Sequence, residues 1–278
     1  MGSRRALQVI GPPACSPGKS SRRALDKALP VLERGKLDWG IRILEHAIRR
    51  APKCPWLWCN LAKALCQKGR RRGSLAALRR ARRYPTRSPQ LLIEMTREFC
   101  CHEQREEELR CAEEAVRLAP RLATTHFNLA ATLHESGRDA EALVHARMGV
   151  ARDPKDGWGQ GLLGQILYRK ERNEEAIPVL ELALALDPRQ TDTWFNLGLA
   201  RLDGDEPEAS YRAFLTFCGM RPDDAMGRAF LALAAARSGR RETALHQRRK
   251  AGGLEQTAIR PQIRRLYGEI REALAEGA

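Results

Sequence analysis

Eight cysteines and six histidines are the side chains of this 278-residue chain that could support metal, redox or nucleophilic chemistry. Cys66, Cys100 and His134 lie 34 residues apart in succession, and Cys59 and Cys101 lie near them in the sequence. Thiolates and imidazoles are zinc ligands, with zinc–sulfur bonds of about 2.3 Å. Neighbouring packed helices are about 8–10 Å apart, which is wide for such bonds. We therefore expect free apolar thiols here, with a metal or redox site as the alternative.

Other reactive patterns in the sequence are incomplete. There is no C-x-x-C pair, and the histidines lie at scattered positions that bring together no Ser-His-acid or Cys-His set. Gly159, Gly161 and Gly164 satisfy G-x-G-x-x-G, but no strand precedes them as a dinucleotide site requires, so we expect a glycine-rich helix. The sequence therefore predicts no catalytic residues, no metal, no cofactor and no enzyme activity.

The 34-residue spacing extends along most of the chain. Equivalent segments start at Ser21, Pro55, Pro89, Ala123, Gly157, Thr191 and Ala225. Their eighth residue is small in every segment: Ala28, Ala62, Thr96, Ala130, Gly164, Gly198 and Ala232. A fixed period of this length is typical of stacked repeats, each of which buries its apolar face against a neighbour.

Each segment also carries signals for a turn and a stop. The fifteenth place is glycine in four segments, at Gly35, Gly69, Gly137 and Gly239. A short turn between two helices needs a residue that tolerates positive φ. The thirty-second place is proline in five segments, at Pro52, Pro120, Pro154, Pro188 and Pro222, and proline ends a helix. Each segment is thus expected to be a helix-turn-helix unit.

With these residues in place, the chain resembles the tetratricopeptide repeat family. The signature is clearest in Trp194-Phe-Asn-Leu-Gly198 through Phe214 to Pro222, and in Asn128-Leu-Ala through Gly137 and Ala142 to Pro154. The resemblance covers residues 21–258 and implies an all-α fold, a right-handed superhelical solenoid with a concave groove lined by the first helix of each of seven units. The sequence departs from the pattern at Glu103, where the turn glycine belongs, at Glu108 and Phe217, where small residues belong, and at Gln256, where the last proline belongs.

The two ends of the chain lie outside the repeat. Residues 1–20 contain no acid and no helical stripe, which favours a flexible basic tail, with a mitochondrial presequence as the alternative to a cytoplasmic protein. Residues 259–278 are expected to form a capping helix whose apolar stripe comprises Ile259, Ile263, Leu266, Tyr267, Ile270 and Leu274. No apolar run reaches about 18 residues, so no transmembrane segment is expected.

Charge is distributed unevenly along the chain. Residues 1–88 carry a net charge of +18, residues 89–224 carry −9, and residues 225–278 carry +6. One second helix is especially basic, with Arg70, Arg71, Arg72, Arg79, Arg80, Arg82 and Arg83. We expect this basic patch to be a solvated convex face. Contact with RNA or the ribosome is an alternative, and self-association of the basic head with the acidic middle of another copy is a further one.

The expected groove offers a mixture of aromatic, amide and cationic side chains. Places two, five, six, nine and twelve of the first helices carry Trp56, Cys59, Asn60, Lys63, Arg97, Phe127, Asn128, Trp158, Gln165, Tyr168, Phe195 and Asn196. Aromatic side chains can bury those of an extended peptide, and asparagine can pair with its backbone. Asn60, Asn128 and Asn196 are similar to a sparse form of the asparagine ladder in the repeat domain of O-linked N-acetylglucosamine transferases. The sequence therefore predicts a scaffold that binds a protein or peptide partner.

Overall fold

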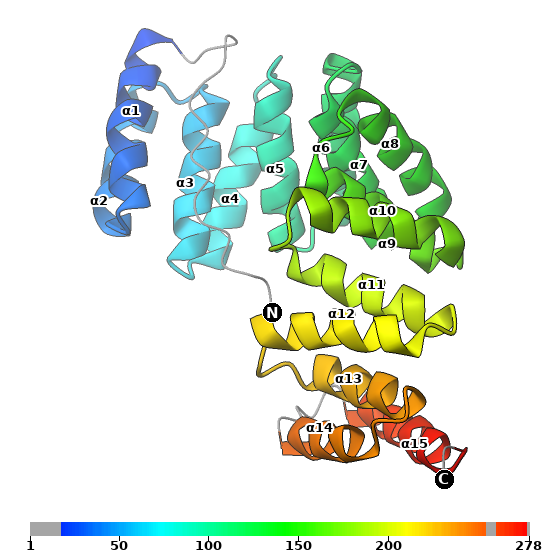
Figure 1. Ribbon diagram of the computed structural model, residues 1–278. Coiled ribbons are helices and arrows are strands. Elements are labelled where there is room, and N and C mark those ends of the chain that lie inside the picture. The colour runs from blue at the N-terminus through cyan, green and yellow to red at the C-terminus, as the bar shows by residue number, and fades with distance from the viewer. Residues whose placement is uncertain (1–17, 254–259, 277–278) are drawn as a thin grey trace. The chain divides into compact units, whose positions relative to one another are not determined.

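The structure, a computed structural model, describes residues 18–253 and 260–276 (Figure 1). The regular secondary structure in these two ranges is helical, without β-strands. The helices are α1 (Lys19–Glu33), α2 (Leu37–Arg50), α3 (Pro55–Gln67), α4 (Arg71–Arg82), α5 (Pro89–Cys101), α6 (Arg105–Leu118), α7 (Ala123–Glu135), α8 (Asp139–Arg152), α9 (Gly157–Arg169), α10 (Asn173–Leu186), α11 (Thr191–Asp203), α12 (Pro207–Met220), α13 (Ala225–Arg237), α14 (Arg241–Gly253) and α15 (Arg260–Glu276). The all-α fold expected from the repeat is confirmed.

The first helices keep the spacing of the sequence. From α3 to α13 every odd-numbered helix begins at the first residue of a 34-residue segment. Helix α1 begins at Lys19, two residues earlier than the repeat predicts, so Lys19 and Ser20 are helical rather than part of a tail. Residues 1–17, which make up the rest of the expected tail, and Gln256 and Ile259 lie outside the described residues.

The described chain divides into two compact units, which we treat separately. The first extends to Ser136 and contains α1–α7, and the second begins at Gly137 and contains α8–α15. In the first unit, α1, α3, α5 and α7 lie in a row, each in contact with the next, and α2, α4 and α6 pack against their own first helices (Figure 1). In the second unit α9 contacts α11. The helices also pack in pairs, α9 with α10, α11 with α12 and α13 with α14.

Small residues allow the two helices of a pair to approach closely. A Cβ atom added to Gly198 in α11 would lie 2.8 Å from the ring of Phe214 in α12. A Cβ atom at Gly164 in α9 would lie 2.5 Å from Cγ of Leu180 in α10. Both distances are shorter than carbon atoms tolerate, so the eighth place is small because the facing helix carries a large side chain there.

The turns between paired helices adopt the left-handed backbone expected at the fifteenth place. Gly35, Gly69, Gly137 and Gly239 have φ between +74° and +77°. Glu103, Glu171 and Asp205 occupy the equivalent positions with φ of 58°, 59° and 57°. Residues with a Cβ atom adopt this conformation at a cost of about 1–2 kcal/mol each. The turn geometry is thus kept even where glycine is absent.

The departure at Phe217 is compensated by a glycine. Phe217 occupies the small twenty-seventh place of its segment and is only 3% exposed. Its ring lies directly against Gly227 of α13, where an added Cβ atom would overlap it. It also packs against Phe195, with ring centroids 5.0 Å apart. Phe217 therefore fits because the glycine at position 227 leaves room for its ring.

A recurring side-chain hydrogen bond ties each proline loop to the helix that follows it. The fourth residue of a first helix donates to the carbonyl oxygen of the preceding thirty-second-place proline. The donor–acceptor pairs are Trp58–Pro52 at 2.7 Å, His126–Pro120 at 2.9 Å, Gln160–Pro154 at 2.9 Å, Trp194–Pro188 at 2.9 Å and Arg228–Pro222 at 2.7 Å. We call this contact the loop latch. The repeat pattern does not predict the loop latch, because the donors are of four residue types, Trp, His, Gln and Arg. These types share only the ability to donate a hydrogen bond.

Helix α15 packs against α13 and α14 at the end of the second unit. Ile263 and Ile270 are fully buried and Leu266 is 7% exposed, so the apolar stripe of this helix faces the repeat. Among the described residues, none of the helices has the length and apolar character needed to cross a bilayer.

Candidate functional site

Three of the expected groove residues of the first unit are buried. Trp56 is 4% exposed, Cys59 is 1% exposed and Phe127 is fully buried. Their side chains are therefore packed within the first unit. These three side chains, at places two and five of α3 and at place five of α7, were expected to face the groove and are buried.

Lys63 and Arg97 do reach the surface of α3 and α5, where they share one carboxylate. Lys63 Nζ lies 2.6 Å from Oε2 of Glu94, and Arg97 Nη1 lies 3.3 Å from Oε1 of the same residue. The side chain of Glu94 is 5% exposed. Burial opposes the charged form of Lys63, but the attraction and hydrogen bond of Glu94 outweigh it and raise the pKa of Lys63. Both cations are therefore held in place by Glu94, which was not among the groove residues predicted from the sequence.

Glu98, one turn further along α5, is a second buried acid. The residue is 9% exposed, and it has no hydrogen bond or ion pair with another described residue. Burial raises the pKa of Glu98 to about 7, Lys63 opposes the rise and Glu94 adds to it. The tenth place is Ala, Thr or Ile in five other segments. The acid at the tenth place of this segment is therefore the sequence feature that could have identified Glu98 as an unusual residue.

The cysteines around Glu98 are held in the thiol form. Burial, followed by the negative charge of Glu98, raises the pKa of Cys59, Cys66 and Cys101. The thiolate is the nucleophile and the metal ligand, so these cysteines are poorly suited to either role.

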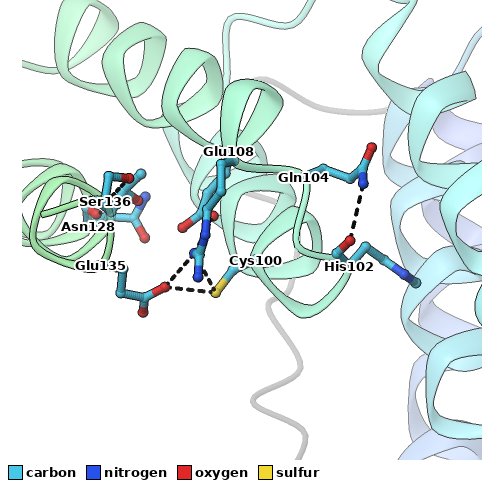
Figure 2. Close-up of polar contacts among 9 residues, drawn as sticks. Cys100, His102, Gln104, Glu108, Asn128, Glu135 and Ser136 are labelled. Carbon is cyan, nitrogen blue, oxygen red and sulfur yellow. Dashed lines mark hydrogen bonds and ion pairs between the residues drawn. The ribbon is translucent and has the colours of Figure 1, made fainter.

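Figure 2 shows a different cluster, between α5, α6 and α7, in which ligand-type side chains converge. Cys100, Glu108 and Glu135 each place one ligand atom within 4.8 Å of the others. The Arg105 guanidinium already occupies this cluster, with Nη1 2.6 Å from Glu135 and 2.9 Å from Glu108. Burial, Glu108 and the hydrogen bond to Glu135 raise the pKa of the Cys100 thiol to about 12. The cluster includes neither Cys66 nor His134, which the 34-residue spacing had suggested.

The same contacts explain the departure from the repeat at Glu108. This residue is 2% exposed at a place where other segments carry a small side chain. Burial raises the pKa of Glu108 in spite of the hydrogen bond from Arg105. Arg105 thus compensates a buried acid, and the charge pair links α6 to α7 through Glu135.

In the second unit one of the expected residues is exposed and the others are half-buried. Trp158 is 41% exposed, and Gln165 and Asn196 are half-buried. Tyr168 is half-buried, and its hydroxyl donates to Asp203 at 2.9 Å. Phe195 instead packs into an aromatic cluster, with ring centroids 5.6 Å from Phe214, 5.0 Å from Phe217 and 5.5 Å from Phe230.

The asparagines of the expected ladder are partly engaged by the protein itself. The Asn60 amide donates to the Trp56 carbonyl at 2.8 Å, which leaves its side-chain oxygen as an acceptor. The amide nitrogen of Asn128 is buried and has no acceptor. These two side chains are therefore not equivalent, although they share one place in the repeat.

The basic patch on α4 has two parts with different roles. Arg71 donates to the Cys101 carbonyl at 2.9 Å, Arg79 donates to Gln104 at 3.1 Å, and Arg82 lies 2.8 Å from Glu114. These three link α4 to the next helix pair. The remaining members are exposed and have no side-chain partner in the described part of the chain: Arg70, Arg72, Arg80 and Arg83.

Comparison with known proteins supports the family suggested by the repeat. The family model for the TPR repeat matches residues 164–204. In a crystal structure of the APC/C hetero-tetramer Cut9–Hcn1, the similar chain has a TM-score of 0.71 at 16% identity, over 90% of this chain and 48% of that one. Residues 164–204 thus match the TPR repeat, and the chain has the fold of solved TPR solenoids.

Other solved solenoids of this family have the same fold over a shorter span. A crystal structure of MamA matches at a TM-score of 0.53 with 19% identity, over 60% of this chain and 91% of that one. YrrB, described as a TPR protein with an unusual peptide-binding site, matches at a TM-score of 0.52 with 19% identity. The match covers 61% of this chain and 87% of that one. A search of curated protein sequences gives no match to this solenoid.

Proposed function

We propose that this solenoid is a non-catalytic scaffold that binds an extended peptide or protein segment along its first helices. The main support is that these helices lie side by side within each unit and carry partly exposed polar and aromatic side chains. YrrB, which shares the fold, is described as a TPR protein with an unusual peptide-binding site. A cytoplasmic location is part of this proposal.

In the second unit the proposed contacts are Trp158, Gln165, Tyr168 and Asn196 of α9 and α11. The exposed indole of Trp158 offers a flat apolar surface, and such rings contribute strongly when a partner buries them. Gln165 and Asn196 carry both a donor and an acceptor, which suits the N–H and C=O groups of an extended backbone. The hydrogen bond to Asp203 fixes the Tyr168 ring, so less side-chain entropy is lost on binding.

In the first unit the proposed contacts are Asn60, Lys63 and Arg97. Glu94 orients both cations, so a ligand carboxylate or backbone carbonyl would meet pre-positioned donors. The side-chain oxygen of Asn60 can accept from a ligand N–H group.

The proposal is tested with a peptide selected from a displayed random library, whose affinity is then measured by calorimetry. The double variant Trp158→Ala/Gln165→Ala should weaken binding at least tenfold, because a buried aromatic contact alone contributes about 2 kcal/mol or more. The variant Lys63→Gln/Arg97→Gln tests the first unit in the same way.

The matched control is Arg80→Gln/Arg83→Gln, which changes two exposed side chains at the end of α4 that have no partner in the described part of the chain. Peptide affinity should be unaffected by this control. The proposal fails if the control abolishes binding while the first-helix variants retain it.

That reversed outcome would favour the second candidate function, an RNA- or ribosome-associated adaptor. Four exposed arginines without partners, Arg70, Arg72, Arg80 and Arg83, are the observation that supports it. Phosphate contacts make such binding strongly dependent on salt. If the Arg80→Gln/Arg83→Gln variant still binds a single-stranded RNA probe at low salt as the wild type does, this candidate function is contradicted.

A further inference from the structure

A pocket lies in the first unit, next to the starts of the first helices α1 and α3. It has a volume of about 750 Å³ and is lined by the start of α1, the loop before α3 and the loop before α5. The two loops contribute residues 51–54 and 85–87. We call it the edge pocket.

The charged side chains that line the edge pocket are both cationic. Lys53 comes from the loop before α3 and Arg87 from the loop before α5, and no acidic residue lines the pocket. Both are exposed, and neither has an ion pair with another described residue. An anion entering the pocket would therefore meet two cations that no acid of the described chain neutralises.

Two helices also begin at the edge pocket. Helix α1 is preceded by Gly18 and α3 by Cys54, and neither residue caps its helix with a side-chain hydrogen bond. The first amides of a helix have no acceptor within the helix, and the helix dipole places partial positive charge there. Anions are favourable ligands at such positions.

The third polar element is the Ser21 hydroxyl. Ser21 lines the edge pocket, is only 3% exposed and makes no side-chain hydrogen bond within the described residues. Buried hydroxyl groups are normally hydrogen-bonded, because an unmade bond costs about 1–3 kcal/mol. A ligand oxygen in the pocket would supply the missing partner.

Apart from the Ser20 and Thr86 side chains, the rest of the edge-pocket lining is apolar or glycine. Trp56 is 4% exposed and forms part of the lining, together with Pro52, Pro55 and Pro85. A bare inorganic ion would leave this surface uncovered. The lining fits a ligand that carries its negative charge on an apolar body.

We propose that the edge pocket binds an anionic group, a phosphate or a carboxylate, attached to an apolar body. Lys53 and Arg87 supply the charge. The first amides of α1, the Trp56 amide of α3, which follows Pro55, and the Ser21 hydroxyl donate hydrogen bonds. The Trp56 ring packs against the apolar part. This site lies apart from the proposed peptide contacts, so its failure would leave the proposed function untouched.

The test uses the full chain, labelled with ¹⁵N, and follows backbone amide shifts as small probes are added. Phenyl phosphate and benzoate separate the two sources of negative charge, and benzyl alcohol is the neutral control. We expect saturable shifts at Ser20, Ser21 and Trp56 with at least one anion, and affinity for benzyl alcohol at least tenfold lower. The tighter of the two anions identifies the chemical class of the ligand.

Two variants and a matched control assign the binding. Lys53→Gln/Arg87→Gln should weaken the tighter anion at least tenfold, and Ser21→Ala should weaken it severalfold. Lys27→Gln/Arg42→Gln neutralises two exposed, unpaired cations of the same unit that do not line the pocket, and it should bind as the wild type does. The proposal is overturned if neither anion gives saturable shifts, if benzyl alcohol binds equally well, or if the pocket and control variants behave alike.

Discussion

Replacement of Glu98 by glutamine should stabilise the first unit in a manner that depends on pH. Glu98 is buried between α3 and α5, and burial raises its pKa from the ordinary value of 4.5 to about 7. The folded protein therefore retains a proton between these pH values that the unfolded chain has lost. Stability contributed by protonated Glu98 is fully present below about pH 4.5 and is lost as pH rises to about 7. A glutamine side chain has no such dependence.

The size of the effect follows from the two pKa values. A difference of about 2.5 in pKa corresponds to about 3 kcal/mol between the protonation states, at 1.36 kcal/mol for each pKa unit. Lys63 favours the charged form and Glu94 opposes it, and the thiols of Cys59, Cys66 and Cys101 are also near enough to feel the charge. The value of about 3 kcal/mol is thus the net result of burial and these neighbours.

The assay is urea denaturation of wild type and Glu98→Gln, followed by circular dichroism at several pH values from 4.5 to 8.5. The variant should gain up to about 3 kcal/mol over wild type between the lowest and highest pH, with most of the change below about pH 7. Glu113→Gln in α6 is the matched control, because Glu113 is exposed and unpaired. A difference between Glu98→Gln and wild type that stays constant with pH, or that shrinks as pH rises, would refute the reasoning.

Three further predictions address the turns, the loop latch and self-association. Glu171→Gly should raise the free energy of unfolding by about 0.5–1 kcal/mol, because glycine adopts positive φ without strain; no change in the urea midpoint would contradict this. Trp194→Phe should lower the free energy of unfolding by about 1 kcal/mol, because the Pro188 carbonyl loses its hydrogen-bond donor. An unchanged urea midpoint would show that the loop latch contributes nothing to stability. Self-association between residues 1–88 and 89–224 predicts a mass above that of the monomer in light scattering at low salt, falling as salt is added, whereas a monomer at low salt ends the idea.

The sequence was sufficient to predict the helix pairs because their signals are local. A glycine at the fifteenth place reflects the backbone conformation of that residue alone, as the φ of Gly137 shows. The small residue at Gly198 reflects one contact, with Phe214, at a fixed distance along the chain. Each signal recurs with the period, so separate weak indications reinforce one another.

The surface could not be predicted as well, because burial depends on the neighbouring helices. Phe127 and Trp56 lie at groove places of the repeat, but both are buried in the fold. Glu94 is an acid at a place where Asn60 and Asn128 stand in other segments, and its pairing with Lys63 joins residues 31 positions apart. Helical periodicity assigns a face to a residue, but it does not determine how much of that face remains open.

The loop latch and the edge pocket have a common origin in the third segment. Its fourth residue is Leu92, which cannot donate a hydrogen bond, and the preceding thirty-second place is Thr86 rather than proline. The loop is held instead by a bond from the Ser88 amide to the Thr86 hydroxyl at 3.1 Å. Thr86 lines the edge pocket together with Arg87. The pocket is therefore lined by one loop that has the latch, residues 51–54, and by one that lacks it, residues 85–87, where the departure from the period leaves Thr86 and Arg87 available for a ligand.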